Sequence, residues 1–124
     1  MDVFKTKEFA RFARRERISD TMLCAAIARA ERGVIDADLG SGLIKQRLPR
    51  RGQGRSGGYR TVVAYGQADR AVFLHGFAKS VQDNLSANDE AALRLAAPAI
   101  LALDHKQVEA LVKVGNWKKV DCDV

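Results

Sequence analysis

The hydrophobic pattern of this chain changes period in its middle third, and that change restricts the folds open to it. In "LIKQRLP" the apolar residues Ile44 and Leu48 alternate with two cations. "YRTVVAY" and "AVFLHGF" are rich in β-branched and aromatic residues, and the turn-like "GQADR" lies between them. Alternation and such composition are typical of β-strands. With the short segment Val34–Leu39 as a first strand, we predict an antiparallel sheet of three or four strands.

Helical periods flank this region on both sides. Before it, two apolar stripes recur at three- and four-residue spacings, which predicts two amphipathic helices joined as a hairpin. Ser19 or Asp20 is placed to cap the second helix, and Gly33 is placed to end it. The first stripe consists of Phe9, Phe12 and Ala13, and the second consists of Leu23, Ala26, Ile27 and Ala30.

The last third of the chain returns to the helical period. Ser86 is part of a capping signal before "AALRLAAPAILAL", in which Pro98 is expected to kink or break the helix. Asp104 can cap a shorter final helix that Gly115 closes. The segment "NWKKVDCDV" fits either an irregular tail or an added edge strand, with Trp117 as its anchor in the core. We therefore expect residues 1–124 to form one α+β domain with two N-terminal helices, the sheet and C-terminal helices.

The sequence lacks the signals of secretion and of membrane insertion. No apolar run reaches the roughly 18 to 20 residues of a membrane span, and "MDVFKTKEFARF" has no signal-peptide core. We therefore expect a cytoplasmic protein that does not bind a membrane. Cys24 and Cys122 lie far apart in the sequence, so we expect two unpaired thiols. His75 and His105 form no metal motif, and we expect neither a metal nor a cofactor.

The net charge of +6 comes from one window of the chain. Between Leu39 and Ala68 there is no acidic residue, whereas the basic residues there are Lys45, Arg47, Arg50, Arg51, Arg55 and Arg60. The whole chain has 21 basic and 15 acidic residues, so the remainder holds 15 of each sign and sums to zero. A concentrated excess of this kind is expected at a site that meets phosphate. A solvated face without a ligand is the alternative for such a charge run.

Two features of this basic segment favour a ligand site. Lys45 and Arg47 are two positions apart in a predicted strand, so both project from the same face. The glycines at positions 52, 54, 57 and 58 remove side chains where a backbone must approach a ligand closely. Tyr59, beside the glycines, either stacks on a base or packs in the core, whereas Tyr65 is expected in the core.

Cations can support the cleavage of RNA without a metal. The 2′-hydroxyl of RNA can attack the adjacent phosphate when a base removes its proton, cations stabilise the added charge and a proton reaches the leaving oxygen. A lysine beside other cations has a lowered pKa and can serve as that base. Arginine stays charged and binds a phosphate through two N–H groups at once.

The segments "RRGQGRSGGYRTVVAY" and "DRAVFLHGFAKSVQDNLS" resemble bacterial toxins of the RelE/HigB superfamily, in the branch marked by G-[KR]-SGG-[YF]-R-T and GFAK. The resemblance covers roughly Lys45 to Ala97, and the two leading helices agree in order and length. It implies a RelE-like α+β fold and a toxin of a toxin–antitoxin pair. Toxins of this kind enter the ribosomal A site and cut messenger RNA there.

The resemblance also implies roles for individual residues. Lys45 and Arg47 match strand cations that act as candidate base and charge stabiliser, and Arg60 matches the arginine on the scissile phosphate. Lys79 of "GFAK" lies near the cation expected as stabiliser or proton donor. RelE carries a catalytic tyrosine where this chain has "SVQDNLS", so Asn84 is expected to bind RNA without donating the proton. Further RNA contacts are expected from Arg50, Arg51, Arg55 and Tyr59.

Two other functions are compatible with the sequence. A ParE-like member of the same fold would inhibit DNA gyrase through protein contacts, and a non-catalytic nucleic-acid-binding module would use the basic segment to hold phosphates. The alternating cations Lys45 and Arg47 favour the enzyme over the gyrase inhibitor, but not over the binding module. The expected partners are a cognate antitoxin, the ribosome and messenger RNA. The expected assembly is either a homodimer or a toxin–antitoxin hetero-oligomer.

Overall fold

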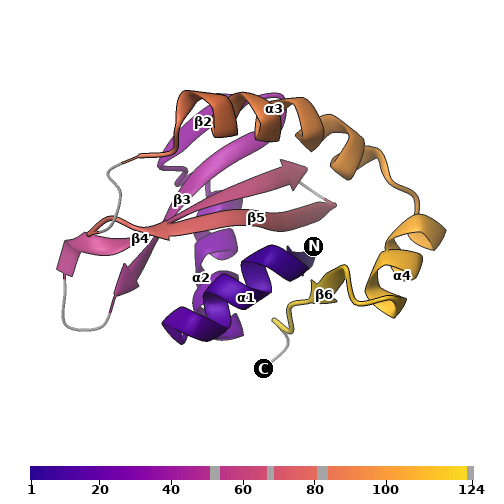
Figure 1. Ribbon diagram of the computed structural model, residues 1–124, viewed down its shortest axis with the longest axis horizontal. Coiled ribbons are helices and arrows are strands. Elements are labelled where there is room, and N and C mark those ends of the chain that lie inside the picture. Colours follow the sequence, from indigo (N-terminus) through magenta and orange to yellow (C-terminus); the bar gives the residue numbers. More distant parts are fainter. Residues whose placement is uncertain (51–53, 67–68, 81–83, 123–124) are drawn as a thin grey trace.

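The computed structural model describes residues 1–50, 54–66, 69–80 and 84–122, and its elements confirm the α+β class (Figure 1). Two helices precede the central strands, and two helices follow them. The elements are β1 (Asp2–Thr6), α1 (Lys7–Glu16), α2 (Asp20–Glu31), β2 (Ala37–Gly40), β3 (Leu43–Arg50), β4 (Gly54–Gly66), β5 (Arg70–Ala78), α3 (Ala87–Ala102), α4 (His105–Lys113) and β6 (Trp117–Lys119).

The sheet has six strands in the order β2-β3-β4-β5-β1-β6, and not the three or four that the sequence predicts. β2, β3, β4 and β5 form the expected antiparallel meander. β1 was not predicted; it pairs parallel with β5 and makes the sheet mixed. β6 pairs antiparallel with β1, so the C-terminal segment supplies an edge strand. The first strand of the meander begins at Ala37, later than the predicted Val34.

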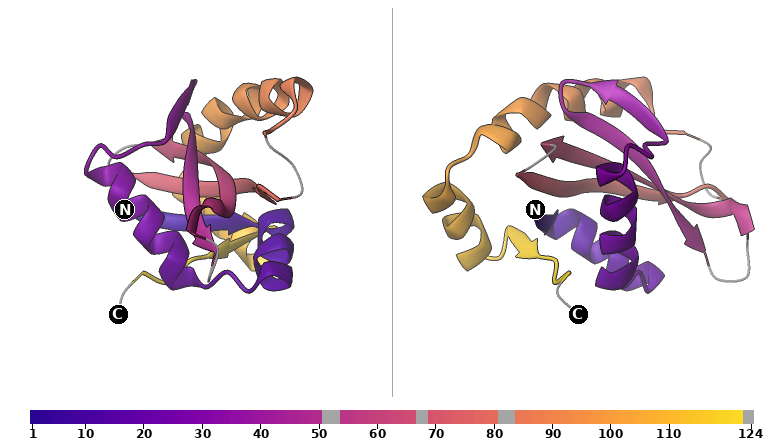
Figure 2. Two further views of the ribbon diagram at one scale, coloured as in Figure 1. Left: turned by 90° about the vertical axis from the view of Figure 1, so that its left-hand side faces the viewer. Right: turned by 180° about the vertical axis from the view of Figure 1, so that it is seen from behind.

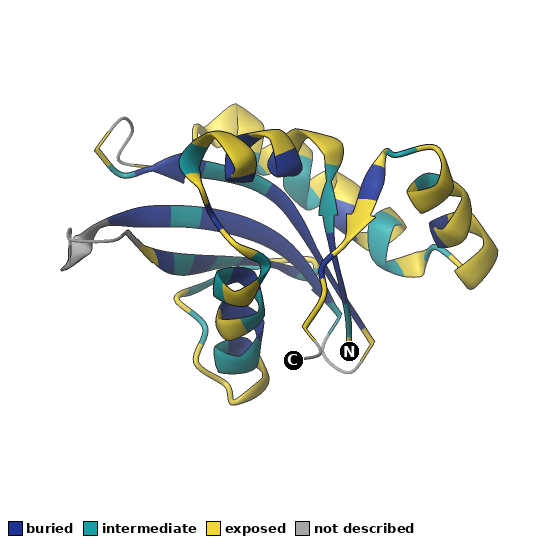
Figure 3. Ribbon diagram, turned by 90° about the horizontal axis from the view of Figure 1, so that it is seen from below, coloured by how far each residue is buried: buried dark blue, intermediate teal, exposed yellow. Residues whose placement is uncertain are grey.

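Helices cover both faces of the sheet. In Figure 1, α3 lies above the sheet, and α1 and α2 lie below it. The apolar core is accordingly divided in two, with the α1–α2 cluster including Phe9, Leu23 and Phe73 and the α3–α4 cluster including Val62, Phe77 and Trp117. Figure 3 shows the buried strands between helices whose outer faces are exposed. Trp117 is buried and packs against Phe4, with ring centroids 5.5 Å apart, which confirms it as the anchor of the C-terminal segment.

The predicted helix caps are confirmed. The side chains of Ser19, Ser86 and Asp104 each accept a hydrogen bond from a backbone N–H in the first turn of the following helix. Of the two effects expected of Pro98, a kink or a break, the break does not occur, because α3 continues as one helix to Ala102. Proline removes one helical hydrogen bond, but the packing of Ala97 and Ile100 against the sheet stabilises α3 on both sides of the gap.

Gly76 allows α1 to lie directly on β5. A Cβ atom at this position would lie 2.5 Å from Cε2 of Phe12 and 3.0 Å from Cε2 of Phe9. Real Cβ atoms are not found so close to other heavy atoms, so a side chain at Gly76 would push the helix away from the strand. The glycine of "GFAK" therefore has a packing role in the α1–α2 core.

The expectation of two unpaired thiols is wrong, because Cys24 and Cys122 form a disulfide with their Cα atoms 5.5 Å apart. The two cysteines approach each other only in the folded chain. β6 pairs with β1 at the edge of the sheet, and the residues after β6 run toward α2. Val120 N–H donates to Val3 O at 2.8 Å, and Asp121 N–H donates to Asp20 Oδ2 at 3.3 Å. Sequence separation alone gives no sign of this approach.

In the described part of the chain, no helix combines the length and the apolar character needed to cross a membrane.

Candidate active site

Cations carried by β3 and by β4 lie on one face of the sheet, and another cation comes just after β5. This face of the sheet is the one on which α3 packs, but α3 covers another part of it. Lys45 and Arg47 share the strand parity of Leu43, and Arg60 shares that of Val62; both apolar residues belong to the α3–α4 cluster. Lys79 follows the end of β5 with the parity of Phe77, another member of that cluster. The predicted catalytic cations Lys45, Arg47 and Arg60 therefore project from one face, and Lys79 lies in the turn that follows β5. The adjoining ends of β3 and β4 project beyond the helices (Figure 2).

Arg47 and Arg60 occupy directly opposite positions in the β3–β4 ladder. Side chains at such positions have Cβ atoms about 4.5–5.5 Å apart, and like charges there are destabilising. Lys45 is one pair farther along on the same face, opposite Val62. The ladder thus places two arginines directly opposite each other, with Lys45 next to them on the same face.

The environment of Arg60 opposes its charge. Burial and, after it, repulsion by Arg47 lower the pKa of Arg60 from its ordinary value, while the carboxylate of Asp36 acts in the opposite direction. A guanidinium group nevertheless keeps its proton in proteins. The site therefore carries a positive charge that is partly desolvated and repelled by its neighbour, which an anion would stabilise.

Each of these two arginines also presents an unpaired donor. Arg47 Nε and Arg60 Nη1 are buried, and neither has a hydrogen-bond partner among the residues that the structure describes. A buried donor without a partner costs about 1–3 kcal/mol, and more when it is charged. A phosphate oxygen between the two side chains would satisfy both N–H groups at once.

Three polar residues that the sequence analysis missed fix the backbone beneath these cations. Arg29 Nη2 donates to Arg47 O, and Asp36 Oδ2 accepts from Arg47 N–H, so both backbone groups of Arg47 are bound. Gln46 is fully buried, accepts from Asp36 N–H at 2.9 Å and donates to Ala26 O at 3.0 Å. The sequence held one signal of this network: Gln46 occupies the inward parity between Ile44 and Leu48, where a polar side chain must find partners.

Lys45 and Asn84 are brought together from distant parts of the sequence. Lys45 Nζ donates to Asn84 Oδ1 at 2.8 Å, and the same oxygen accepts from Leu85 N–H at 2.9 Å. Asn84 lies just before Ser86, the N-cap of α3, so the segment entering α3 reaches the cation face. Lys79 is half-buried, and its N–H donates to Gly58 O of β4 at 3.2 Å, which fixes its backbone against the same strand.

Three of the four glycines, at positions 54, 57 and 58, lie in a strand, since β4 begins at Gly54. At Gly58 a Cβ atom would lie 2.3 Å from Leu48 O, so the close neighbour is the backbone of β3 instead of a ligand. Of the remaining predicted RNA contacts, Arg51 lies outside the described residues, and Arg50 and Arg55 are placed by their backbone alone in β3 and β4.

Tyr59 takes the packing alternative. Its side chain is buried, and its ring meets that of Phe12 edge-on with centroids 5.8 Å apart. It points to the α1–α2 core, away from the cation face, so the expectation that it contacts RNA is not supported by its position. Tyr65 lies in the same cluster, as predicted, and its burial, followed by the charge of Glu31, raises its pKa.

Within the described ranges, no three His, Cys, Asp or Glu side chains are grouped as ligands for a metal ion. The cation face itself is formed by ammonium, guanidinium and amide groups, which suit an anion.

The chain is thus a small basic α+β domain with a six-stranded mixed sheet and two half-buried arginines paired across β3 and β4. The family model described as "RelE toxin of RelE / RelB toxin-antitoxin system" matches residues 1–120. The chain therefore belongs to the RelE toxin family and is a toxin of a toxin–antitoxin system, whose family implies a cognate antitoxin as partner. No curated protein matches the sequence.

Proposed function

We propose that this toxin is a ribosome-dependent endoribonuclease that cuts messenger RNA with the cation face formed by Lys45, Arg47, Arg60 and Lys79. The observation that carries the proposal is the pair Arg47 and Arg60, which face each other with one buried, unpartnered N–H group each among the described residues. Folding does not favour such a pair without an anion, whereas a phosphodiester would pair with both groups.

The arrangement supports cleavage by the RNA's own 2′-hydroxyl. Lys45 would take the hydroxyl proton while the oxygen attacks the adjacent phosphorus. Arg47 and Arg60 would hold the two non-bridging oxygens, where negative charge increases in the transition state. The bond from phosphorus to the 5′-oxygen then breaks, and that oxygen takes a proton, for which Lys79 is the candidate donor. The products are a 2′,3′-cyclic phosphate and a free 5′-hydroxyl.

Asn84 supports this assignment by its contact with the candidate base. The 2.8 Å hydrogen bond from Lys45 Nζ to Asn84 Oδ1 fixes the ammonium group over the sheet face. The amide oxygen of Asn84 thus orients the lysine side chain toward the proposed RNA site. Arg50, Arg51 and Arg55 would add phosphate contacts along the same strand ends.

The proposal is tested by inducing the toxin briefly in cells and mapping message ends by primer extension. Cuts that recur within translated reading frames, and that disappear when initiation is blocked, are expected. Intact messages with an SOS response would instead support a gyrase inhibitor. Intact messages on which ribosomes stall, without an SOS response, would support a binding module that holds RNA without cutting it.

A further inference from the structure

The edge of β3 has no strand beside Arg47. In the described ladder, β2 pairs with β3 only as far as Lys45, so β3 continues past β2 with an open edge. The backbone N–H and C=O of Arg47 bind the side chains of Asp36 and Arg29, and both groups therefore point to this edge and away from β4. Arg47 and Arg60 thus form a non-hydrogen-bonded pair, in which opposite side chains are closest. Their repulsion acts where no backbone hydrogen bond joins the two strands directly.

Asp36 is brought to this edge by Gln46, whose side chain is fully buried. Gln46 Oε1 accepts from Asp36 N–H at 2.9 Å, and Gln46 Nε2 donates to Val34 O at 3.1 Å and to Ala26 O of α2 at 3.0 Å. The connection from α2 to β2 is therefore bound at two points to one side chain of β3. Adjacent residues of a strand point to opposite faces, so Gln46 points into the protein while Arg47 points to the cation face.

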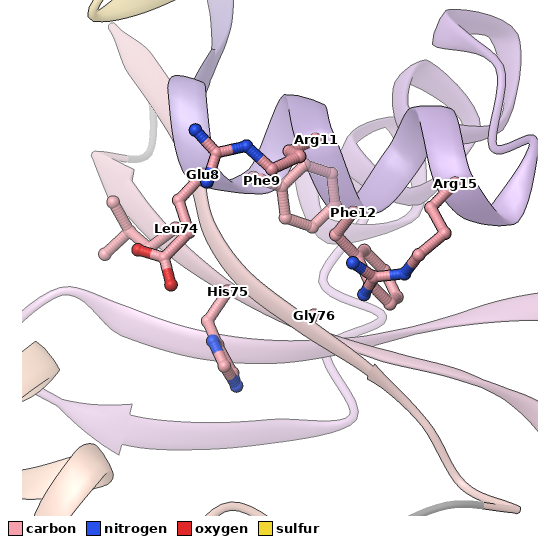
Figure 4. Close-up of a pocket in the computed structure, with 8 residues that line it drawn as sticks. All are labelled: Glu8, Phe9, Arg11, Phe12, Arg15, Leu74, His75 and Gly76. Carbon is pink, nitrogen blue, oxygen red and sulfur yellow. The ribbon is translucent and has the colours of Figure 1, made fainter.

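The two N-terminal helices support different strands. α1 lies on β5, and the cavity of about 240 Å³ between them is lined by residues of these two elements alone (Figure 4). α2 contacts β3, and it supplies both Ala26 O and the guanidinium group of Arg29. The Arg47 support, which consists of Asp36, Arg29 and Gln46, has no part in that cavity and joins the cationic strand to α2.

Asp36 also acts through its charge. Burial and repulsion by Arg47 lower the pKa of Arg60, and the carboxylate of Asp36 opposes them. A carboxylate would repel an RNA phosphate, so contact with RNA does not explain an acid at this position. An acid that binds Arg47 N–H and attracts Arg60 is explained, because it lowers the free energy of holding two cations together before an anion arrives.

We propose that Asp36 is a positioning residue of this toxin: its carboxylate holds the open edge of β3, so that Arg47 stays opposite Arg60, ready for a phosphodiester. The inference rests on the proposed function, because cleavage is the activity that the two arginines would support. Asp36 acts through Arg47, and it neither touches RNA nor moves a proton. Arg29 completes the contact by binding Arg47 O.

The test compares two substitutions at Asp36 in single-turnover cleavage on programmed ribosomes. Asp36→Ala removes the acceptor for Arg47 N–H and is expected to lower the saturating rate about tenfold, the size of one hydrogen bond, with little change in the ribosome concentration at half-maximal rate. Asp36→Asn keeps an oxygen acceptor and is expected to stay within about threefold of the wild type. A general acid or base would lose as much activity with asparagine as with alanine, so equal losses would overturn the positioning role.

Asp38 supplies the matched control. It is an exposed acid two residues farther along, and its carboxylate accepts from Gly40 N–H at 2.9 Å within the β2–β3 hairpin. Asp38→Ala changes the net charge by the same amount as Asp36→Ala and should leave the cleavage rate unchanged. An equal fall in both variants would assign the loss to net charge or to the hairpin, and would overturn the inference.

Hydrogen exchange at the amide of Arg47, measured by NMR on the toxin alone, tests the contact independently of cleavage. An amide at an open edge exchanges quickly unless a hydrogen bond protects it, so exchange is expected to be about tenfold faster in Asp36→Ala and nearly unchanged in Asp36→Asn. Exchange at the wild-type rate in Asp36→Ala would overturn the inference. Protection that depends on Asp36, in a wild type that cuts no message, would overturn the proposed function and with it the role in cleavage. The same spectra show whether each variant is folded.

Discussion

At the scale of single residues, two guanidinium groups facing each other across a strand pair raise the free energy of the folded chain until an anion joins them. Arg47 and Arg60 are such a pair. Under the proposed function, their contributions to stability and to cleavage therefore have opposite signs. A residue kept for a purely structural purpose would behave differently, since its removal would weaken the fold.

Arg60→Ala is expected to lower single-turnover cleavage on programmed ribosomes by about 100- to 1000-fold, as the loss of an oxyanion contact does in other enzymes. The melting temperature is expected to stay the same or to rise, because the substitution removes a desolvated charge that Arg47 repels. Both quantities can be measured on one preparation. A variant that melts well below the wild type would show that Arg60 supports the fold.

The substitution Lys45→Arg tests whether Lys45 acts as the base or only binds a phosphate. Arginine keeps the positive charge but does not release its proton, so cleavage is expected to fall by about 100-fold or more, in the range of a lost general base. Ribosome binding, measured by co-sedimentation, should weaken only modestly. Cleavage at the wild-type rate would mean that Lys45 contacts phosphate and that another group is the base.

The sequence predicted the shared face of Lys45 and Arg47, because a strand alternates its side chains with a fixed period. It did not predict that Arg47 faces Arg60. That pairing depends on the register of β3 against β4, which shifts between Leu48 and Arg50. Nor could it place Asn84 beside Lys45, since that contact requires the path of the chain from β5 to α3.

At the scale of elements, the local sequence was sufficient to predict the helices that have a capping residue. The helices after Ser19, Ser86 and Asp104 begin where their capping residues predict. β1 escaped prediction because it has five residues, leads directly into α1 and gains its stability from a partner more than sixty residues away in the sequence. The close neighbour of Gly58 was predicted to be a ligand and is instead the backbone of β3, because the packing of β3 against β4 is a tertiary property.

Gly58→Ala is expected to lower the free energy of unfolding by about 1–3 kcal/mol, the usual range for overpacking. The added methyl group would lie 2.3 Å from Leu48 O, and a backbone atom in a ladder cannot move aside as a side chain can. Urea unfolding of the two proteins measures the difference. An unchanged midpoint would mean that β3 and β4 separate without cost at this position.

At the scale of the whole molecule, the disulfide joins the end of the chain to α2 across 98 positions of sequence. Closing a loop of about 100 residues in the unfolded state stabilises a fold by up to about 4.7 kcal/mol in the chain-entropy description. Cys122→Ser is therefore expected to lose several kcal/mol of unfolding free energy without reductant. With reductant, the variant and the wild type should unfold alike; a persistent difference would assign the loss to packing.

The same bond makes most of the chain a covalent ring, with residues 1–23 as a tail that leads into it. A protease that pulls its substrate through a narrow pore as one extended strand could take in the N-terminal tail, but at Cys24 it would meet two strands together. Pulling from the C-terminal side, it would meet the same junction at Cys122. We therefore expect the oxidised toxin to resist threading from its C-terminus, and degradation of a C-terminally tagged form, followed with and without reductant, measures this. Equal rates would show that the pore admits a doubled chain.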